Sequence, residues 1–323
     1  MNKRASRASK IIGPATIGPT AVATLLAGLV ASQAPALAAS PRPVLAVAAE
    51  NEYASVISQI GGRYVTVEAI MSNPNTDPHE FEANAGVAAE VSQAQLIVQN
   101  GMGYDTFMNK IEAASHRRGR LVVVAQDLLG MKATAFNPHL WYNPRTMPDV
   151  ARAVSEDLSK LEPSHGAYFK ANLAAFDTSL KPWTAAIASF KARYAGTPVA
   201  VTEPVADYML QAAGADIKTP ETLQSAIMNG TDPSPQDISI EETLLSKREV
   251  KAFLYNRQVT DSFTASLLSL AKKAHVPVVA VYETMPVPGY NYQSWMVAEV
   301  GALTKAVSSG HSTPTLLNSG PRS

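Results

Sequence analysis

The chain has 323 residues, of which 46% are hydrophobic and 17% charged. It is long enough for two globular lobes and too apolar for intrinsic disorder. Lys+Arg and Asp+Glu are equal in number at 27 each, which gives no support to nucleic-acid binding through a clustered basic surface. The chain has no cysteine, so disulfides, a lipid-anchored cysteine and thiolate metal ligands are excluded. Any metal site must use nitrogen and oxygen ligands.

The first forty residues have the layout of a secretory signal. Basic residues come first, an apolar run over residues 11–30 follows, and the small-residue stretch from Ala34 to Ala39 ends the segment. Glycines and prolines within the apolar run argue against a stable membrane-spanning helix. We therefore predict a signal peptide over residues 1–39, cleaved after Ala38 or Ala39. An uncleaved anchor is disfavoured because no stop-transfer segment follows.

Export to the periplasm or the medium is the expected outcome of this signal. Removing its four basic residues leaves 23 Lys+Arg against 27 Asp+Glu. The exported protein is then mildly acidic, which is compatible with small cationic ligands and not with a polybasic membrane patch.

From residue 44 onward, β-rich runs alternate with helical periodicity. Strands are expected at residues 44–49, 65–71, 96–100 and 121–125, with helices over 51–60, 84–92 and 104–114 between them. Asn51 and Asn84 are the expected N-caps of the first two helices. Such βα repetition predicts a mostly parallel sheet, so residues 40–162 are expected to form an N-terminal α/β lobe.

A second set of the same kind follows over residues 196–310. Strands are expected at residues 199–202, 251–255 and 276–282, with helical patterns starting at Asp237, Asp261 and Ser294. Residues 216–235 carry three prolines and are read as strand fragments and loop. The sequence therefore predicts a C-terminal α/β lobe.

A long helical connector is expected between the lobes, over residues 163–195. Pro182 interrupts its periodicity, which predicts either a kink or two abutting helices because proline removes a backbone hydrogen bond. After the second lobe, residues 311–323 are rich in Ser, Thr, Pro and Gly and are predicted to form a flexible tail.

Two histidines stand in loops that follow expected strands. His79 lies in the stretch Asp77-Pro78-His79-Glu80-Phe81-Glu82, and His139 lies in the stretch from Asn137 to Pro144. Ligands of open α/β sheets bind beyond the carboxyl ends of the strands, so both histidines are placed to meet a ligand. In isolation, a histidine after a proline in a loop is more often a surface or capping residue.

Two glutamates terminate very apolar strands of the second lobe. Glu203 follows the run 199–202 and Glu283 follows the run 276–282. An ionised carboxylate beside a buried strand end is costly unless it is paired or coordinates a cation, and one divalent ion would satisfy both. The simpler alternatives are a helix N-terminal acid for Glu203 and an ion pair with Arg or Lys for Glu283.

These residues resemble a family, the metal-specific substrate-binding proteins of bacterial zinc and manganese ABC transporters. The resemblance rests on the two histidine motifs and on Tyr168 and Asn172 within the connector. It implies two α/β lobes joined by a rigid helix, with a metal held in the cleft by four ligands. It also implies delivery to an ABC permease with its ATPase, and a monomer.

The resemblance places the four metal ligands at His79, His139, Glu203 and Glu283. The family has a histidine or a glutamate at the third position, and usually an aspartate where this chain has Glu283. The histidine-rich loop of many zinc receptors is absent, since only His116 lies between residues 103 and 130. Two imidazoles and two carboxylates would neutralise a 2+ ion and shift preference toward harder ions, yet zinc outranks manganese at most such sites. The transported ion is therefore expected to be Zn²⁺ or Mn²⁺.

Two other functions are compatible with an exported two-lobed protein. A metallohydrolase would need an open coordination position and a separate base, and the sequence contains no H-E-x-x-H, G-x-S-x-G or phosphate-binding loop. A receptor for an organic solute would use Trp141, Tyr142 and Trp295 over the cleft, although aromatic residues beside loops are more often simple packing. His116, His165 and His275 have no ligand-like context. We predict a receptor rather than an enzyme.

Overall fold

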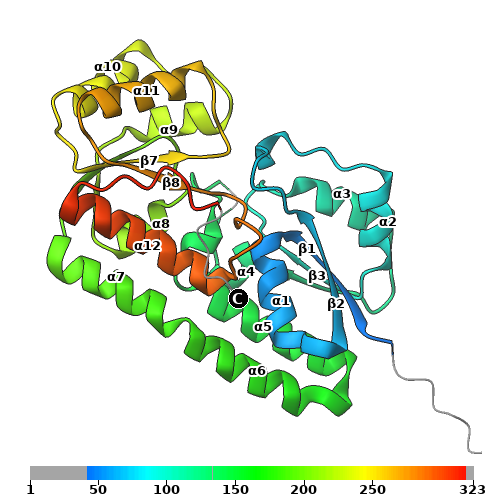
Figure 1. Ribbon diagram of the computed structural model, residues 1–323. Coiled ribbons are helices and arrows are strands. Elements are labelled where there is room, and N and C mark those ends of the chain that lie inside the picture. The colour runs from blue at the N-terminus through cyan, green and yellow to red at the C-terminus, as the bar shows by residue number, and fades with distance from the viewer. Residues whose placement is uncertain (1–41, 133, 318–323) are drawn as a thin grey trace, which may run out of the picture. The chain divides into compact units, whose positions relative to one another are not determined.

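The computed structural model describes residues 42–132 and 134–317. The predicted signal peptide lies outside these residues. Within them the chain forms two α/β lobes, each with one four-stranded sheet, and helices that join them (Figure 1). The predicted fold class is confirmed. No helix among the described residues is both long and apolar enough to cross a bilayer.

The first sheet has the order β2-β1-β3-β4, and all its strands are parallel. Its elements are β1 (Val44–Glu50), α1 (Asn51–Gly61), β2 (Val65–Met71), α2 (Ala85–Gln93), β3 (Leu96–Gln99), α3 (Thr106–Ala114), β4 (Leu121–Val124), α4 (Ala125–Leu129) and α5 (Thr146–Leu161). Strand β3 is buried along its whole length and β1 almost so, which explains their apolar sequences: helices cover both faces of a parallel sheet.

The second sheet repeats this order as β6-β5-β7-β8, again parallel. Its elements are β5 (Pro198–Val201), α8 (Asp207–Ala212), β6 (Asp216–Ile217), α9 (Glu221–Met228), α10 (Pro235–Ser246), β7 (Ala252–Asn256), α11 (Ser262–Lys273), β8 (Val278–Val281) and α12 (Tyr292–Ser309). Strand β6 and helix α9 lie in the segment expected to be strand fragments and loop. Leu223 and Ile227 are the only buried apolar residues of α9, and one such pair is a weak signal in eight residues.

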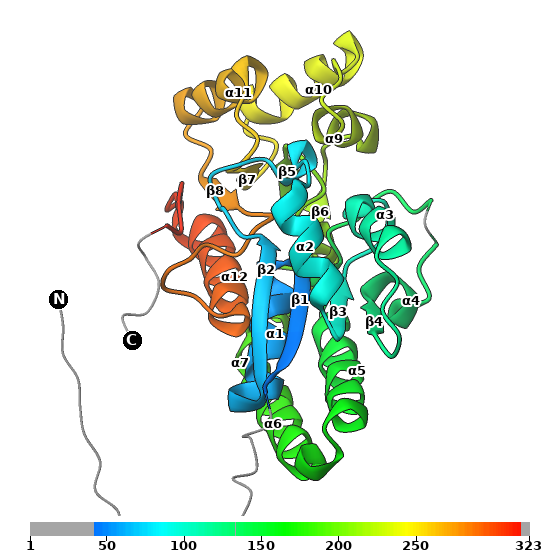
Figure 2. The same ribbon diagram turned by 90° about the vertical axis from the view of Figure 1, so that its right-hand side faces the viewer.

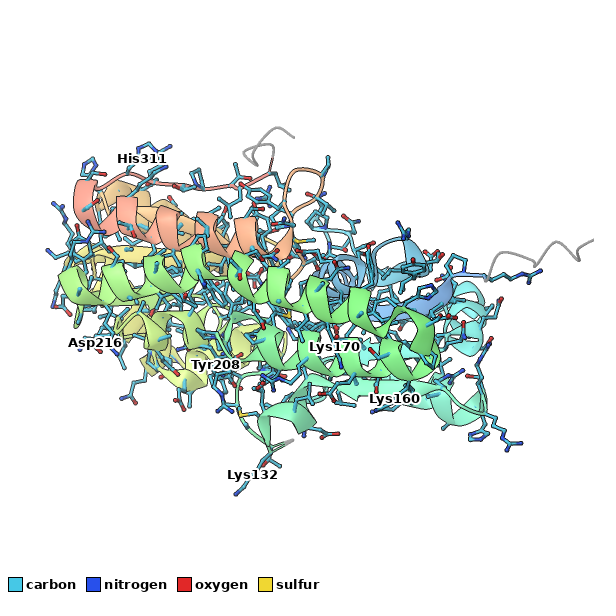
Figure 3. The ribbon with its side chains drawn as sticks, turned by 90° about the horizontal axis from the view of Figure 1, so that it is seen from below. Lys132, Lys160, Lys170, Tyr208, Asp216 and His311 are labelled. Carbon is cyan, nitrogen blue, oxygen red and sulfur yellow. The ribbon has the colours of Figure 1, made fainter. Side chains whose placement is uncertain are left out.

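The connector consists of two abutting helices, as the position of Pro182 predicts. One residue, Leu180, separates helix α6 (Gly166–Ser179) from helix α7 (Lys181–Tyr194). Pro182 lies in the first turn of α7. Proline is tolerated there because its missing N–H would have no partner within the helix. Helix α6 packs on α1 and α5 of the first lobe and α7 packs on α12 of the second, so the connector runs along both lobes (Figures 2 and 3).

Polar contacts fasten the connector to the first lobe. Asn172 donates a hydrogen bond to the carbonyl of Ile60 at 2.9 Å. Beside it, Gly62 has a positive φ of 50°, and a Cβ atom there would lie 2.2 Å from the hydroxyl of Tyr168. The turn after α1 therefore requires glycine on both counts. The Tyr168 and Asn172 pattern is explained by this anchoring.

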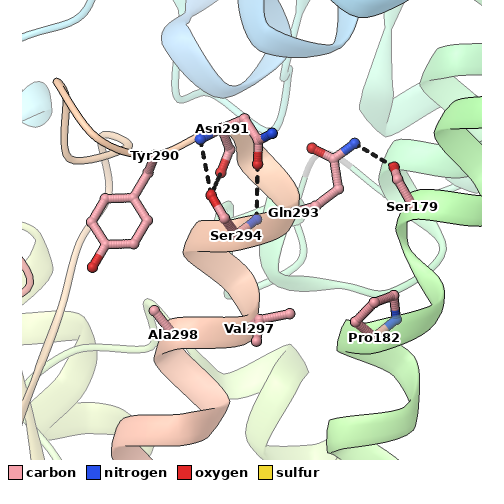
Figure 4. A pocket seen from close by; sticks show the side chains of 8 residues that line it. All are labelled: Ser179, Pro182, Tyr290, Asn291, Gln293, Ser294, Val297 and Ala298. Atoms are coloured by element: carbon pink, nitrogen blue, oxygen red, sulfur yellow. Dashed lines mark hydrogen bonds between the residues drawn. The ribbon is translucent and has the colours of Figure 1, made fainter. Parts of the chain in front are cut away.

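A glutamine joins the two lobes at the break between α6 and α7. Gln293 on α12 donates to Gln59 on α1 and to Ser179 at the end of α6, each at 2.7 Å. Figure 4 shows the hydrogen bond from Gln293 to Ser179 together with Asn291, whose side chain caps the start of α12. These hydrogen bonds connect the first lobe, the second lobe and the connector at one place.

Two features of the local structure differ from the sequence expectations. Asn84 caps α2 as predicted, but α1 begins at Asn51 itself, whose side chain exchanges two hydrogen bonds with the backbone of Met285 in the other lobe. Residues 311–317, expected within a flexible tail, lie against the second lobe: Thr313 pairs with β8, and Leu316 is buried. Strand β8 is an edge strand with unpaired backbone groups, which this segment covers. Residues 318–323 lie outside the described residues.

A carboxyl group is buried in the core of the second lobe. Glu299 is 1% exposed, and its Oε1 accepts hydrogen bonds from Trp295 (2.9 Å) and Tyr142 (3.2 Å). Burial raises the pKa of Glu299 from 4.5 to about 8, although these two hydrogen bonds oppose the shift. The folded protein therefore keeps a proton on Glu299 that the unfolded chain loses above pH 4.5.

Glu299→Gln is expected to remove this pH-dependent penalty. In the wild type the free energy of unfolding should fall as pH rises from about 4.5 to about 8, with a contribution approaching about 1.4 kcal/mol per pH unit. The variant should match the wild type at the acidic end and exceed it at the alkaline end, as measured by urea denaturation across this range. The exposed Glu90→Gln should show no such difference. A constant offset between Glu299→Gln and the wild type would refute the assignment.

Candidate metal centre

His79 is held at the carboxyl end of β2 by a short 3-10 turn, Pro78–Glu80. The side chain of Asp77 caps this turn by accepting a hydrogen bond from the backbone N–H of His79 at 2.8 Å. Pro78 at the start of the turn fixes its backbone angle. The imidazole is 23% exposed, and it is the solvent-facing member of the group described below.

His139 is fully buried, and its tautomer follows from its partners. Asn137 donates its amide to the carbonyl of Pro204, so its oxygen faces His139 and accepts from the backbone N–H at 2.9 Å. The same oxygen lies 2.8 Å from Nδ1 of His139. Because an amide oxygen only accepts, Nδ1 carries the proton and Nε2 presents its lone pair to the cleft. Trp141 packs edge-on against the ring at 5.4 Å between centroids.

Glu283 follows β8, and one of its carboxylate oxygens lies close to both imidazoles. Its Oε2 lies 3.1 Å from Nε2 of His79 and 3.2 Å from Nε2 of His139, and it accepts a 2.8 Å hydrogen bond from the hydroxyl of Tyr104. Ligand atoms of the two histidines and Glu283 lie within 4.8 Å of one another. Three of the four residues singled out in the sequence are thus brought together from two lobes.

Glu203 stands next to this group rather than within it. It follows β5, is 2% exposed, and its Oε2 accepts a hydrogen bond from Asn256 at 3.3 Å. Its other oxygen, Oε1, is buried and has no hydrogen-bond partner among the described residues. A carboxylate in this position is unsatisfied without a proton or a cation.

The charges of the site are strongly coupled. Burial lowers the pKa of His79, but the charge of Glu283 and the hydrogen bond to it outweigh this and raise the pKa to about 9. Burial holds the pKa of His139 below its usual value. For Glu283, burial opposes ionisation, yet the charge of His79 and its hydrogen bond to Glu283 lower the pKa.

The pKa of Glu203 is shifted in the opposite direction from the pKa of Glu283. Burial, and then the negative charge of Glu283, raise its pKa well above the usual value. At neutral pH the group therefore contains a proton between His79 and Glu283, and burial disfavours the ionised form of Glu203. A divalent cation can replace that proton and stabilise the ionised form of Glu203, because it would meet two imidazole nitrogens and two carboxylates.

The aromatic residues proposed to cover the cleft divide into two groups. Trp141, Tyr142 and Trp295 are all fully buried. Trp141 lies against His139, whereas Tyr142 and Trp295 donate to Glu299 in the core of the second lobe. For Tyr142 and Trp295 the packing interpretation is therefore correct. The other histidines set aside in the sequence lie elsewhere: His165, for example, stacks on Tyr64 at 3.8 Å between centroids.

Sequence reasoning missed the polar residues that orient the group. These residues are Tyr104, Asn256 and Gln258. The side-chain oxygen of Gln258 accepts a 2.7 Å hydrogen bond from the backbone N–H of Glu283. Gln258 also donates to the carbonyl of Thr76, in the loop that carries His79. Asn256 ends the buried strand β7, so the signal was the same as for the two glutamates: a polar residue closing an apolar strand.

A cavity of about 970 Å³ opens beside the exposed face of His79. It lies between the loop after β2 and the segments 227–230 and 258–261 of the second lobe. Among the residues that the structure describes, its lining contains the acidic residues Asp77, Glu80, Glu82 and Asp261 and no lysine or arginine. An ion reaching His79 through this cavity passes negatively charged walls.

Comparison with known proteins agrees with this architecture. The chain is 29% identical over 149 residues to the zinc-binding protein TroA of Treponema pallidum, which is 44% of this chain and 47% of that protein. It is 22% identical over 140 residues to the manganese-binding lipoprotein MntA of Bacillus subtilis, which is 42% and 45% of the two chains. The matched stretch thus spans about half the length of these relatives.

Solved structures show the same fold over a longer stretch. The structure of the periplasmic zinc-binding protein TroA from Treponema pallidum superposes with a TM-score of 0.68 at 19% identity, covering 84% of this chain and all of that one. The family described as ZnuA, zinc-uptake complex component A, periplasmic, matches residues 46–306. Because this match covers most of the chain, the protein belongs to the ZnuA family.

Proposed function

We propose that this protein is the extracytoplasmic substrate-binding protein of an ABC importer, which captures a divalent transition metal between its lobes and delivers it to the permease. The observation that carries the proposal is the approach of two imidazole Nε2 atoms to one carboxylate oxygen of Glu283. Such an arrangement holds a proton or a cation at its centre. Membership of the ZnuA family, and relatives named for zinc and manganese binding, favour a metal as cargo.

The metal ligands we propose are His79, His139, Glu203 and Glu283. His79 and His139 belong to the first lobe and the two glutamates to the second, so the bound ion would link the lobes. Glu203 would turn its unpartnered Oε1 toward the ion. The set neutralises a 2+ charge, and the cargo we propose is Zn²⁺ or Mn²⁺.

Binding without catalysis fits this ligand set. Four protein ligands fill the coordination of a tetrahedral ion and leave no position for an activated water, which a metallohydrolase requires. An organic solute is a weaker candidate, because the ligand atoms of His79, His139 and Glu283 lie within 4.8 Å of one another and leave no room for such a molecule between them. We propose an exported monomer whose partners are the permease and its ATPase.

Competitive titration tests the ligands. The metal-stripped wild type should bind one zinc or manganese ion per chain, and alanine at each of His79, His139, Glu203 and Glu283 should weaken binding by at least about 100-fold, more than the loss of a supporting residue. His116→Ala, at an exposed histidine in the first lobe, is the matched control and should bind as the wild type does. Binding that survives all four substitutions would reject the site.

Acidification should release the ion. Because the pKa of His79 is raised to about 9, its proton competes with the metal throughout the neutral range. Affinity should therefore increase with pH, by about ten-fold per unit for each proton displaced, and at least one proton should leave per ion bound. Calorimetry in buffers of different ionisation enthalpy measures this number. An affinity that does not change between about pH 6 and pH 8 would contradict the assigned protonation.

Asn137 should matter for affinity although it is not a ligand. Asn137→Ala removes the acceptor that fixes the Nδ1–H tautomer of His139, and losing such a partner typically costs about 10- to 100-fold in metal affinity. Asn137→Asp keeps an acceptor in the same place and should recover part of the loss. Equal affinity of the alanine variant and the wild type, measured by the same competition, would show that the tautomer is fixed in another way.

A further inference from the structure

Asn256 bridges the two carboxylates of the second lobe. It ends β7, the strand that lies between β5 and β8 in the sheet, and Glu203 and Glu283 follow those two neighbours. Its amide nitrogen donates to Oε2 of Glu203 at 3.3 Å and, in a shorter hydrogen bond, to Oε1 of Glu283. One NH₂ group thus serves both acids.

The orientation of this amide is fixed by its other partners. The oxygen of Asn256 accepts the backbone N–H of Gln258 at 3.0 Å, so the nitrogen must face the glutamates. The backbone N–H of Asn256 donates to the hydroxyl of Thr202, the residue before Glu203, at 2.9 Å. The side chain is buried, and water does not compete for these bonds.

The bridge leaves each glutamate with one oxygen for a cation. Asn256 holds Oε1 of Glu283, whereas Oε2 faces His79 and His139. It also holds Oε2 of Glu203, whereas Oε1 has no partner among the described residues. Bidentate binding by either acid would require its second oxygen to move toward the ion and would weaken its charge-assisted hydrogen bond with Asn256.

We propose that Asn256 limits both glutamates to monodentate binding and so keeps the site four-coordinate, which biases it toward ions that accept four ligands. This rests on the proposed function. Two nitrogens and two oxygens suit tetrahedral zinc, whereas manganese prefers more oxygen ligands, which a bidentate glutamate would supply. Asn256 is a positioning residue that determines specificity without contacting the ion.

The test uses Asn256→Leu, which has similar volume and no donor, and Asn256→Ala. Cobalt(II) serves as a probe, because its visible absorption is intense in four-coordinate sites and weak in higher coordination. The wild type should give the intense spectrum, and both variants should lose it. The ratio of manganese to zinc affinity should rise by at least about ten-fold, as expected for losing a hydrogen bond to a charged group.

Asn172→Ala is the matched control, since it removes a side-chain amide hydrogen bond in the connector. It should change neither spectrum nor ratio. X-ray absorption of the zinc-loaded wild type gives the coordination number without any variant, so the proposal is testable even if the substitutions prevent folding. A wild type with five or more ligands, or folded variants with the wild-type spectrum and ratio, would overturn it. A wild type that binds neither ion tightly would instead reject the proposed function.

Discussion

The structure depends on a single carboxylate oxygen at which the two lobes meet. Oε2 of Glu283, from the second lobe, contacts His79, His139 and Tyr104, all from the first. A buried carboxylate is tolerated only where it is paired and hydrogen-bonded, so Glu283 requires the first lobe to be in place. Other hydrogen bonds near Glu283 also join the two lobes. Asn51 bonds to the backbone of Met285, and Gln258 links Glu283 to the loop of His79.

The repeated sheet topology explains why these residues can meet. In both lobes the first strand lies second in the sheet, and the polar groups of the site follow the carboxyl ends of β2, β5, β7 and β8. Open parallel sheets place ligands at such edges. The abutting helices α6 and α7 run along both lobes, and the contacts of Gln293 fix their junction. The connector thereby holds the two edges toward each other.

Much of the fold can be predicted from the sequence, because short local patterns of residues indicate most of its strands and the break in its connector. Seven of the eight strands in the described part of the chain stand out as short β-rich runs, and the position of Pro182 predicts the break in the connector. Strand β6 has two residues and α9 one buried apolar pair, too little for a periodic signal. Asn51 does not cap its helix because its side chain hydrogen-bonds to the other lobe. The position of residues 311–317 depends on their pairing with the edge strand β8. Both are long-range contacts.

For the site, the sequence by itself determined which residue types are available and where along the chain they fall. With no cysteine, any metal ligands must be nitrogen and oxygen, and two histidines and two glutamates follow expected strands. Only the tertiary structure decided that His79, His139 and Glu283 share one centre while Glu203 stands beside it. It also decided which hydrogen bonds Asn137, Tyr104 and Asn256 make to these residues. The physical reason is that orientation, tautomer and charge state depend on hydrogen bonds between residues far apart in the chain.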